Sequence, residues 1–398
     1  MKEQIQKLWK GLVNDVFHPI RIRIKGLPWI CKVLILLLGL LVIGYLKYPG
    51  EAKAAVSTVK YYYRASGFPP KGQVPLTAEQ RRVLVREINN LTAGLQLQLR
   101  DSRTISTQNA WSIAQIVFAL ERTNLLDVAA LVDTADKYYD AKAHGYFEYL
   151  QDRKVSHVHI SAWMVLAWSM AGLKIDPAQV EFLLDQQNPN GWWAVFESAT
   201  DSYGNASTFA TAFTANALHN FTKRHPQTEF SSDISLAVDK AREWLLSHKA
   251  KPCVWYDYYF KENERMESLS ISALTLHTLH QMDPNETRTN FKLMDKAWLQ
   301  SLPGAVHTPT YKEVSAITVE TQKAGGRRDV IRHYVLPWQV VATVDAYQNG
   351  NWFQRAQAQK WIDNLISSLD QTSLNTSDIP WVAAEFLFAL KYLAGQKI

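Results

Sequence analysis

The sequence is poor in cysteine and almost without net charge beyond its first 32 residues. Its two cysteines, Cys31 and Cys253, lie far apart in the chain, which argues against a disulfide framework and excludes a cysteine-rich zinc site. Residues 1–32 account for five of the six net positive charges. The rest is nearly neutral, whereas a nucleic-acid-binding domain would carry its own basic patch. We therefore expect no metal, no cofactor and no nucleic-acid partner.

Only one run is apolar enough to suggest a membrane anchor. Residues 33–46 contain no charge, and with their flanks, residues 29–48, they reach the roughly 20 residues that span a bilayer. Trp, Tyr and Lys flank the run, as is typical of membrane interfaces. We expect an uncleaved transmembrane helix that attaches the protein to the membrane. The alternative is a signal peptide cleaved after the Ala-Lys-Ala of residues 52–54.

The charges around this run predict its orientation. More Lys and Arg residues precede the span than follow it, which favours an N-terminus in the cytoplasm and a main domain outside it. Residues 1–28 are basic and begin with an amphipathic helical pattern, expected to lie on the anionic leaflet or to dock on a partner. Residues 49–76 are a predicted linker, and residues 77–398 are the main domain.

The composition is that of an ordered protein with a large core, at 47% hydrophobic residues and 14 Trp. Six apolar segments rich in small residues span residues 109–120, 157–173, 207–221, 268–279, 334–347 and 380–393. More amphipathic segments precede them at residues 79–98, 127–139, 177–187, 234–248, 291–302 and 353–369. Helices that are apolar around most of their circumference are buried. The alternation predicts an all-α fold of six helix pairs in two concentric rings, an (α/α)6 toroid or barrel preceded by one transmembrane helix; an open solenoid is the alternative.

One turn of this pattern resembles a known repeat. Residues 182–193 read Phe-Leu-Leu-Asp-Gln-Gln-Asn-Pro-Asn-Gly-Trp-Trp, and Ser207 opens the next apolar segment; residues 244–256 hold a weaker copy. This is similar to the Q-x-x-x-G-x-W repeat of the squalene cyclase and protein prenyltransferase toroids. The resemblance implies their α/α-toroid scaffold.

The catalytic signatures of that family are missing. No D-x-D-D acid motif and no C-x-E-Q thioester motif occur, and Lys251 stands where the prenyltransferase zinc pattern needs an Asp two residues before Cys253. The resemblance therefore implies a fold and says little about chemistry.

The long connections predict where a site lies. Residues 140–156, 188–206, 249–267 and 303–333 lead from amphipathic to apolar segments, so in a ring they emerge together at the N-terminal ends of the apolar helices. They combine aromatic and acidic side chains, which suits a carbohydrate: rings stack on sugar faces, and two carboxylates about 5–9.5 Å apart can hydrolyse a glycosidic bond.

The predicted catalytic residues are loop acids and a histidine at a helix start: Glu197, Asp201, Asp257 and His157. The predicted substrate-binding residues are mostly aromatic: Trp192, Trp193, Tyr203, Trp255, Tyr256, Tyr258, His333 and Tyr334. In the competing interpretation the aromatic residues only staple turns and the acids are only solvated. Residues 323–328, Lys-Ala-Gly-Gly-Arg-Arg, match no phosphate-binding loop and indicate a mobile lid or a partner-binding loop.

Three functions fit these patterns. The first is an extracytoplasmic, membrane-anchored domain that binds or hydrolyses an envelope glycan. The second is a non-catalytic toroid that serves as scaffold or partner-binding subunit of a membrane complex. The third is a lipid or isoprenoid binder, which requires a wide apolar lumen. An open or a filled lumen discriminates between them.

Overall fold

In the computed structural model, the described part of the chain belongs to the second of two compact units, residues 66–398. The described residues are 72–100, 102–106, 108–120, 128–147, 156–195, 206–251, 254–256, 267–284, 312–317, 329–371 and 380–395. The predicted cytoplasmic segment, the anchor at residues 29–48 and most of the linker lie outside them. Within the described ranges, no helix combines the length and apolar character needed to cross a membrane.

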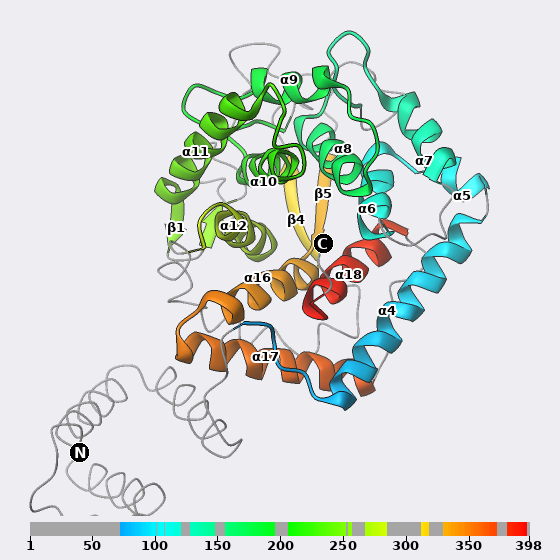
Figure 1. The fold of residues 1–398 in the computed structure, drawn as a ribbon, viewed down its shortest axis with the longest axis vertical. Coiled ribbons are helices and arrows are strands. Elements are labelled where there is room, and N and C mark those ends of the chain that lie inside the picture. The colour runs from blue at the N-terminus through cyan, green and yellow to red at the C-terminus, as the bar shows by residue number, and fades with distance from the viewer. Residues whose placement is uncertain are drawn as a thin grey trace, which may run out of the picture. The chain divides into compact units, whose positions relative to one another are not determined.

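Six buried helices form a closed ring. They are α6 (Ala110–Leu120), α8 (Val158–Ala171), α10 (Thr208–Arg224), α12 (Leu269–Met282), α16 (Val335–Asn349) and α18 (Pro380–Leu393). Each packs against the next in chain order and α18 packs against α6, so the ring closes, as Figure 1 shows. This closure confirms the α/α toroid and excludes the open solenoid.

The amphipathic helices lie outside this ring. They are α4 (Ala78–Leu99), α7 (Val128–Ala135), α9 (Pro177–Asp185), α11 (Ser231–Ser247) and α17 (Trp352–Gln371), with the short α5 (Ser102–Ser106) and the 3-10 turn η2 (Asp136–Tyr138) between α4 and α8. Each of the five packs against an inner helix. The predicted helix at residues 291–302 lies outside the described residues. For the other predicted helices the ends agree with the structure to within three residues, except that α7 ends at Ala135 and the 3-10 turn η2 continues to Tyr138.

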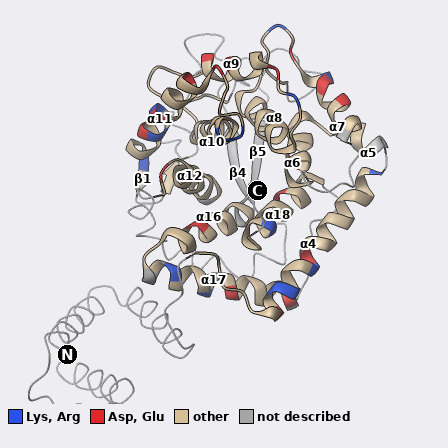
Figure 2. Cartoon of the chain, in the orientation of Figure 1, with Lys and Arg blue, Asp and Glu red and all other residues tan. Residues whose placement is uncertain are grey.

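The burial of the inner helices follows from their composition. In α8 every residue from Val158 to Met170 is buried. Buried hydroxyls bond to carbonyls of their own helix, as Thr275 Oγ1 donates to Ile271 O at 2.7 Å. Charged residues gather instead on α4, α11 and α17 (Figure 2). The six inner helices carry only two carboxyl groups, Asp345 and Glu385, and both are buried.

Three connections from outer to inner helices share one hydrogen-bond arrangement. In each, an aromatic residue donates its backbone N–H, at 2.9 Å, to a hydroxyl one turn inside the next inner helix. The pairs are Tyr146 with Ser161, Trp193 with Thr211, and Trp255 with Ser272. Both indoles also donate Nε1–H, at 2.7 Å, to a carbonyl in the last turn of the preceding outer helix, Leu183 O and Leu245 O. The repeat seen in the sequence is thus a staple between the two rings.

Gly191 is required by this staple. Its φ is +96°, and a Cβ would lie 2.4 Å from the carbonyl oxygen of Lys240 in α11. We expect G191A to lower the free energy of unfolding by about 2–4 kcal/mol, because left-handed strain and a backbone clash add. Gly172 is the matched control, with φ +70° and open space around it, so G172A should cost only about 1–2 kcal/mol. Urea unfolding of the full chain in detergent micelles measures both, and equal losses would contradict the role of the contact.

Short strands correct the expectation of an all-α fold. β1 (Lys249–Lys251), β2 (Val254–Tyr256) and β3 (Glu267–Ser268) form an antiparallel sheet in the connection before α12. β4 (Lys312–Ile317) and β5 (Asp329–Tyr334) pair antiparallel, with Lys312 opposite Tyr334 and Ile317 opposite Asp329. The sequence analysis treated residues 303–333 as loop, because six alternating residues are too few to stand out in a long connection. Residues 323–328 lie outside the described residues.

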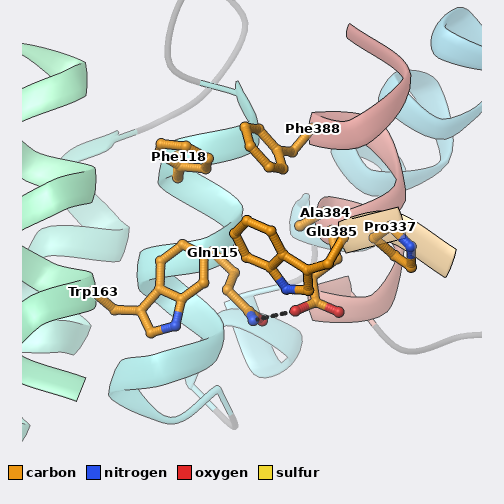
Figure 3. Close-up of a pocket in the computed structure, with 8 residues that line it drawn as sticks. Gln115, Phe118, Trp163, Pro337, Ala384, Glu385 and Phe388 are labelled. Carbon is orange, nitrogen blue, oxygen red and sulfur yellow. Dashed lines mark hydrogen bonds between the residues drawn. The ribbon is translucent and has the colours of Figure 1, made fainter. Parts of the chain in front are cut away.

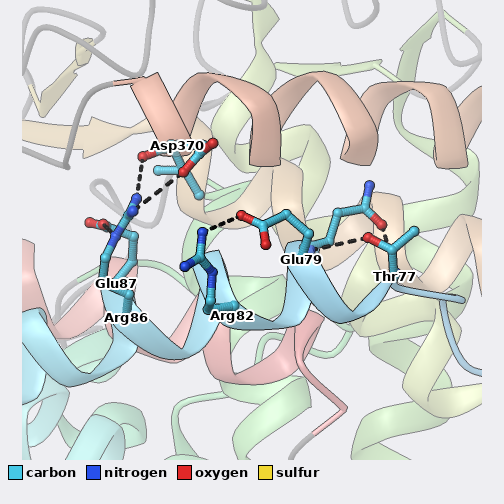
Figure 4. A network of polar contacts seen from close by, with 8 residues as sticks. Thr77, Glu79, Arg82, Arg86, Glu87 and Asp370 are labelled. Carbon is cyan, nitrogen blue, oxygen red and sulfur yellow. Dashed lines mark hydrogen bonds and ion pairs between the residues drawn. The ribbon is translucent and has the colours of Figure 1, made fainter.

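The outer layer closes between its first and last helices. α4 packs against α17, and Arg86 of α4 donates to Asp370 Oδ1 at 3.3 Å and to Leu369 O at 3.1 Å (Figure 4). Gln80 donates to Asp363 Oδ1 at 2.8 Å. Arg86 also donates Nε–H, at 3.0 Å, to the buried carboxyl of Glu87. Residues nearly 300 positions apart thus meet along this seam.

Helix α4 begins with a capping box at Thr77, the first residue of the predicted main domain. Thr77 Oγ1 accepts from the backbone N–H of Gln80 at 3.1 Å, and Gln80 Oε1 accepts from the N–H of Thr77 at 2.9 Å, a closed capping box. Glu79, in the same turn, forms an ion pair with Arg82 at 2.5 Å (Figure 4).

Candidate functional site

One end of the ring collects the N-termini of the inner helices, and we call this end the mouth. Among the described residues, five inner helices follow an outer helix, and α16 meets α12 near both C-terminal ends through Asp345 and His277, so all six run in the same direction. Their positive dipole ends therefore lie together at the mouth. β5 continues directly into α16, so the β4–β5 hairpin belongs to this end, and in the view of Figure 1 it projects across the middle of the ring.

Side chains fill the lumen of the ring between the described residues. One buried ring comes from each inner helix: Phe118, Trp163, Phe213, His277, Trp338 and Phe388. Their centroids are close across helix boundaries, 4.2 Å for Trp163 with Phe213 and 4.7 Å for Phe118 with Phe388. A wide apolar lumen, which the lipid-binder hypothesis requires, is therefore not found in the described part of the toroid.

Two neighbouring inner helices face each other through three matched rungs. Nearest the mouth, the indoles of Trp111 (α6) and Trp381 (α18) stack with centroids 5.2 Å apart, and both are half-buried. One turn deeper, Gln115 Nε2 donates to Glu385 Oε1 at 3.1 Å. Below that lies the contact of Phe118 with Phe388. The polar rung is thus held between aromatic rungs, one of them partly open to solvent.

A small pocket lies beside the polar rung (Figure 3). Its lining comes from four inner helices: Gln115, Phe118, Trp163, Pro337, Trp338, Ala384, Glu385 and Phe388. The space holds about one water molecule. Three buried polar atoms of this lining have no hydrogen-bond partner among the described residues: Glu385 Oε2, Gln115 Oε1 and Trp163 Nε1. An unsatisfied buried polar group costs about 1–3 kcal/mol, so these atoms mark a place where a polar group is expected to bind.

Burial raises the pKa of Glu385 to about 8, so its carboxyl is protonated and uncharged at neutral pH. Since Oε1 accepts the Gln115 hydrogen bond, the proton belongs on Oε2. A neutral carboxylic acid can donate a hydrogen bond or a proton. This is the chemistry that the mouth offers among the described residues.

His157 and His159 lie at the mouth end of α8 and are both buried. Burial lowers the pKa of His157 and lowers that of His159 to about 4, so both rings are neutral at neutral pH. The His157 N–H donates to Tyr146 O at 2.8 Å, which ties this residue to the first staple. The His159 ring lies 5.5 Å from that of Phe209, centroid to centroid.

The predicted substrate-binding residues fall into three groups. Trp193 and Trp255 are fully buried and bonded to outer-helix carbonyls; they serve packing, and we leave them out of the site proposed below. Trp192 and Tyr256 are half-buried at the mouth end. For β5, which holds His333 and Tyr334, the structure describes the backbone only. Tyr203 and Tyr258, and the three predicted catalytic acids Glu197, Asp201 and Asp257, lie outside the described residues.

A second polar cluster lies toward the opposite end of the lumen. The buried carboxyl of Asp345 (α16) accepts from His277 Nδ1 at 2.8 Å and from the Tyr392 hydroxyl at 2.5 Å. Asn349 Nδ2 donates to His280 Nε2 at 2.9 Å. Burial and the adjacent Asp345 hold the pKa of Tyr392 well above its usual value, so the phenol is the donor. Three consecutive inner helices are joined here. In the described ranges, no group of three or more His, Cys, Asp or Glu could hold a metal ion.

The sequence analysis missed the residues at the centre of this site. Glu385, Gln115, Trp111 and Trp381 belong to inner helices, whereas the search for chemistry was directed to loops. The signal was present, because a carboxyl in an otherwise apolar, buried helix needs an explanation.

Comparisons with known proteins address the fold. No family model and no curated protein matches the amino-acid sequence. A similar solved structure is a GH76 α-mannanase of Bacteroides thetaiotaomicron, with a TM-score of 0.51 over 78% of this chain and 96% of that chain, at 8% identity. Another is a β-1,3-1,4-glucanase from Paenibacillus sp. X4, with a TM-score of 0.50 over 84% and 96%, at 10% identity. These likenesses support an α/α toroid and do not support the squalene cyclase and prenyltransferase family suggested by the repeat.

Proposed function

We propose that the chain is a membrane-anchored toroid that binds a carbohydrate at its mouth, with residues 29–48 as the anchor and the toroid outside the cytoplasm. The stacked pair of Trp111 and Trp381 carries this proposal. Flat rings above a few hydrogen-bonding groups are the usual make-up of a site for a neutral polar ligand. The names of the two structural neighbours, an α-mannanase and a β-glucanase, support the same ligand class.

Hydrolysis is the second half of the proposal. The acid and the base or nucleophile of the reaction are assigned to Glu197, Asp201 and Asp257. His157 is assigned the role of a neutral proton acceptor. Further contacts with the substrate are assigned to loop and hairpin residues: Trp192, Tyr203, Tyr256, Tyr258, His333 and Tyr334.

Removing the tryptophan pair tests binding. We expect W111A and W381A each to weaken binding to mannan or mixed-linkage β-glucan tenfold or more, because truncating a central aromatic contact commonly costs over 1–2 kcal/mol. The measurement is calorimetric titration of the full chain in detergent micelles. Phe230, a half-buried aromatic residue at the start of α11, where the ring is furthest from the mouth, is the matched control. F230A should bind with the affinity of the unmodified chain. If the unmodified chain binds neither polysaccharide, the proposal is overturned.

The same preparation tests hydrolysis. The triple variant E197Q/D201N/D257N should release no reducing ends from a polysaccharide that the unmodified chain cleaves, because carboxamides neither donate a catalytic proton nor attack. Retained cleavage would contradict the assignment of these acids.

The filled lumen favours a second candidate, a non-catalytic toroid that binds a protein partner in a membrane complex. Purification from membranes in mild detergent distinguishes the two. A stoichiometric partner together with no glycan binding would favour the scaffold, and a lone monomer would argue against it.

A further inference from the structure

We propose that the pocket below the tryptophan pair binds one uncharged hydroxyl group, of a carbohydrate at the mouth or of a water molecule, between Glu385 and Gln115. The inference rests on the proposed function for its carbohydrate form and names the group of the ligand that enters deepest. Figure 3 shows Gln115 of α6 bonded to Glu385 of α18, with Trp163 of α8 on the other side of Gln115.

The donors and acceptors of the pocket fit a hydroxyl. The protonated Oε2 of Glu385 is a donor, and Oε1 of Gln115 is an acceptor; neither has a partner among the residues that the structure describes. A hydroxyl can accept one hydrogen bond and donate another, so it can pair with both atoms. A carboxylate cannot donate to Gln115, and an ammonium group cannot accept from Glu385.

The size and position of the pocket restrict further which ligand group can enter it. With room for about one water molecule, it admits a hydroxyl and excludes a sugar ring. It lies one helical turn, about 5.4 Å, below the indoles of Trp111 and Trp381. A sugar stacked there would reach it best with an exocyclic hydroxymethyl arm. The site should therefore prefer hexose polymers to polyuronates, which carry a carboxylate in place of that arm.

No other charge compensates Glu385, because burial alone accounts for the shift of its pKa. α6 has no titratable residue. The buried titratable groups of the other helices at the pocket or against α18 are His157 and His159 on α8, Asp345 and Tyr347 on α16, and Glu87 on α4. A ligand carboxylate would thus meet no cation in the pocket.

Binding measurements test the carbohydrate form. The full chain in detergent micelles should bind mannan or mixed-linkage β-glucan at least tenfold more tightly than polygalacturonate, since a site built for a hydroxyl rejects a group that cannot pair with it. E385M and Q115M should each lose about tenfold in affinity for the neutral polymer, the equivalent of one to two hydrogen bonds. E385Q should retain it, because its amide still donates. Q179M makes the same change at a buried glutamine of outer helix α9 and should bind normally.

A crystal structure in which water molecules are visible distinguishes a carbohydrate hydroxyl from a water molecule in the pocket. In the free protein we expect an oxygen within hydrogen-bond distance of Glu385 and Gln115; in the complex, a sugar hydroxyl replaces it or the water stays. A pocket without an oxygen in both states overturns the inference. Equal affinity for hexan and polyuronate, or unchanged binding by E385M, overturns its carbohydrate form. If the unmodified chain binds no polysaccharide, the proposed function fails, and the free structure alone decides whether the hydroxyl site exists.

Discussion

Replacing Asp345 with alanine is expected to lower the free energy of unfolding of the toroid by about 3–5 kcal/mol. The carboxyl is fully buried and accepts hydrogen bonds from His277 and Tyr392, which belong to the two adjacent inner helices. Its removal leaves both donors inside the ring without this acceptor and opens a cavity of carboxyl size. Urea unfolding of the full chain in detergent micelles, followed by tryptophan fluorescence, measures the loss.

Two further variants define the source of that loss. Y392F removes a single hydrogen bond and should cost about 1–3 kcal/mol. Asp239 is an exposed aspartate on α11, and D239A should stay within about 0.5 kcal/mol of the unmodified chain. If D345A were as mild as D239A, the cluster would not hold the three helices together.

Glu385 should make the stability of the toroid depend on pH. Its pKa is about 8 in the folded protein and 4.5 in the reference state, so between these values the folded chain binds a proton that the unfolded chain has lost. The free energy of unfolding therefore falls as pH rises through this window, by about 1.4 kcal/mol per unit, and levels off above pH 8. At pH 7 the accumulated cost is about 3 kcal/mol.

The variant E385Q removes this dependence, because the amide is uncharged at every pH. It should be close to the unmodified chain near pH 4.5 and more stable at pH 7 and 8, with the difference growing along the stated slope. Urea unfolding at pH 5, 6, 7 and 8 gives the comparison. Glu243, exposed on α11, supplies the control E243Q, expected within about 0.5 kcal/mol throughout. A constant difference between E385Q and the unmodified chain would mean that Glu385 is ionised in the folded protein.

The ring could be predicted from the sequence because its signals are repeated. Apolar segments such as residues 157–173 and 380–393 bury their whole circumference, and six similar copies reinforce one another. One staple was also foreseeable, since Gly191 and Trp193 belong to the repeat that the sequence shows before an apolar helix. The β4–β5 hairpin could not be predicted, because an alternating pattern over only six residues is too short to stand out in a long connection.

The site could be predicted only by region. The aromatic residues in the loops predict a site at the mouth, and the proposed site lies at that end. The stack of Trp111 on Trp381 joins residues 270 positions apart, and single-sequence patterns carry no record of such pairings. Trp193 and Trp255 illustrate the opposite error: an aromatic residue in a loop was assigned to a ligand, while its indole N–H is bonded inside the fold.

The closed ring also constrains how the chain can fold. Helix α6 is an early element of the toroid, yet one of its two ring neighbours is α18, and α4 likewise needs α17. During synthesis from the N-terminus, the apolar flanks of these early helices stay without their final partners until nearly all of the toroid has been made. Helices that pack mainly on chain neighbours, such as α8 and α10, can assemble sooner. We expect ring closure to be the late and slow event of folding, because contacts between distant segments form last, and a chain stopped before α18 would expose an aromatic lumen to self-association.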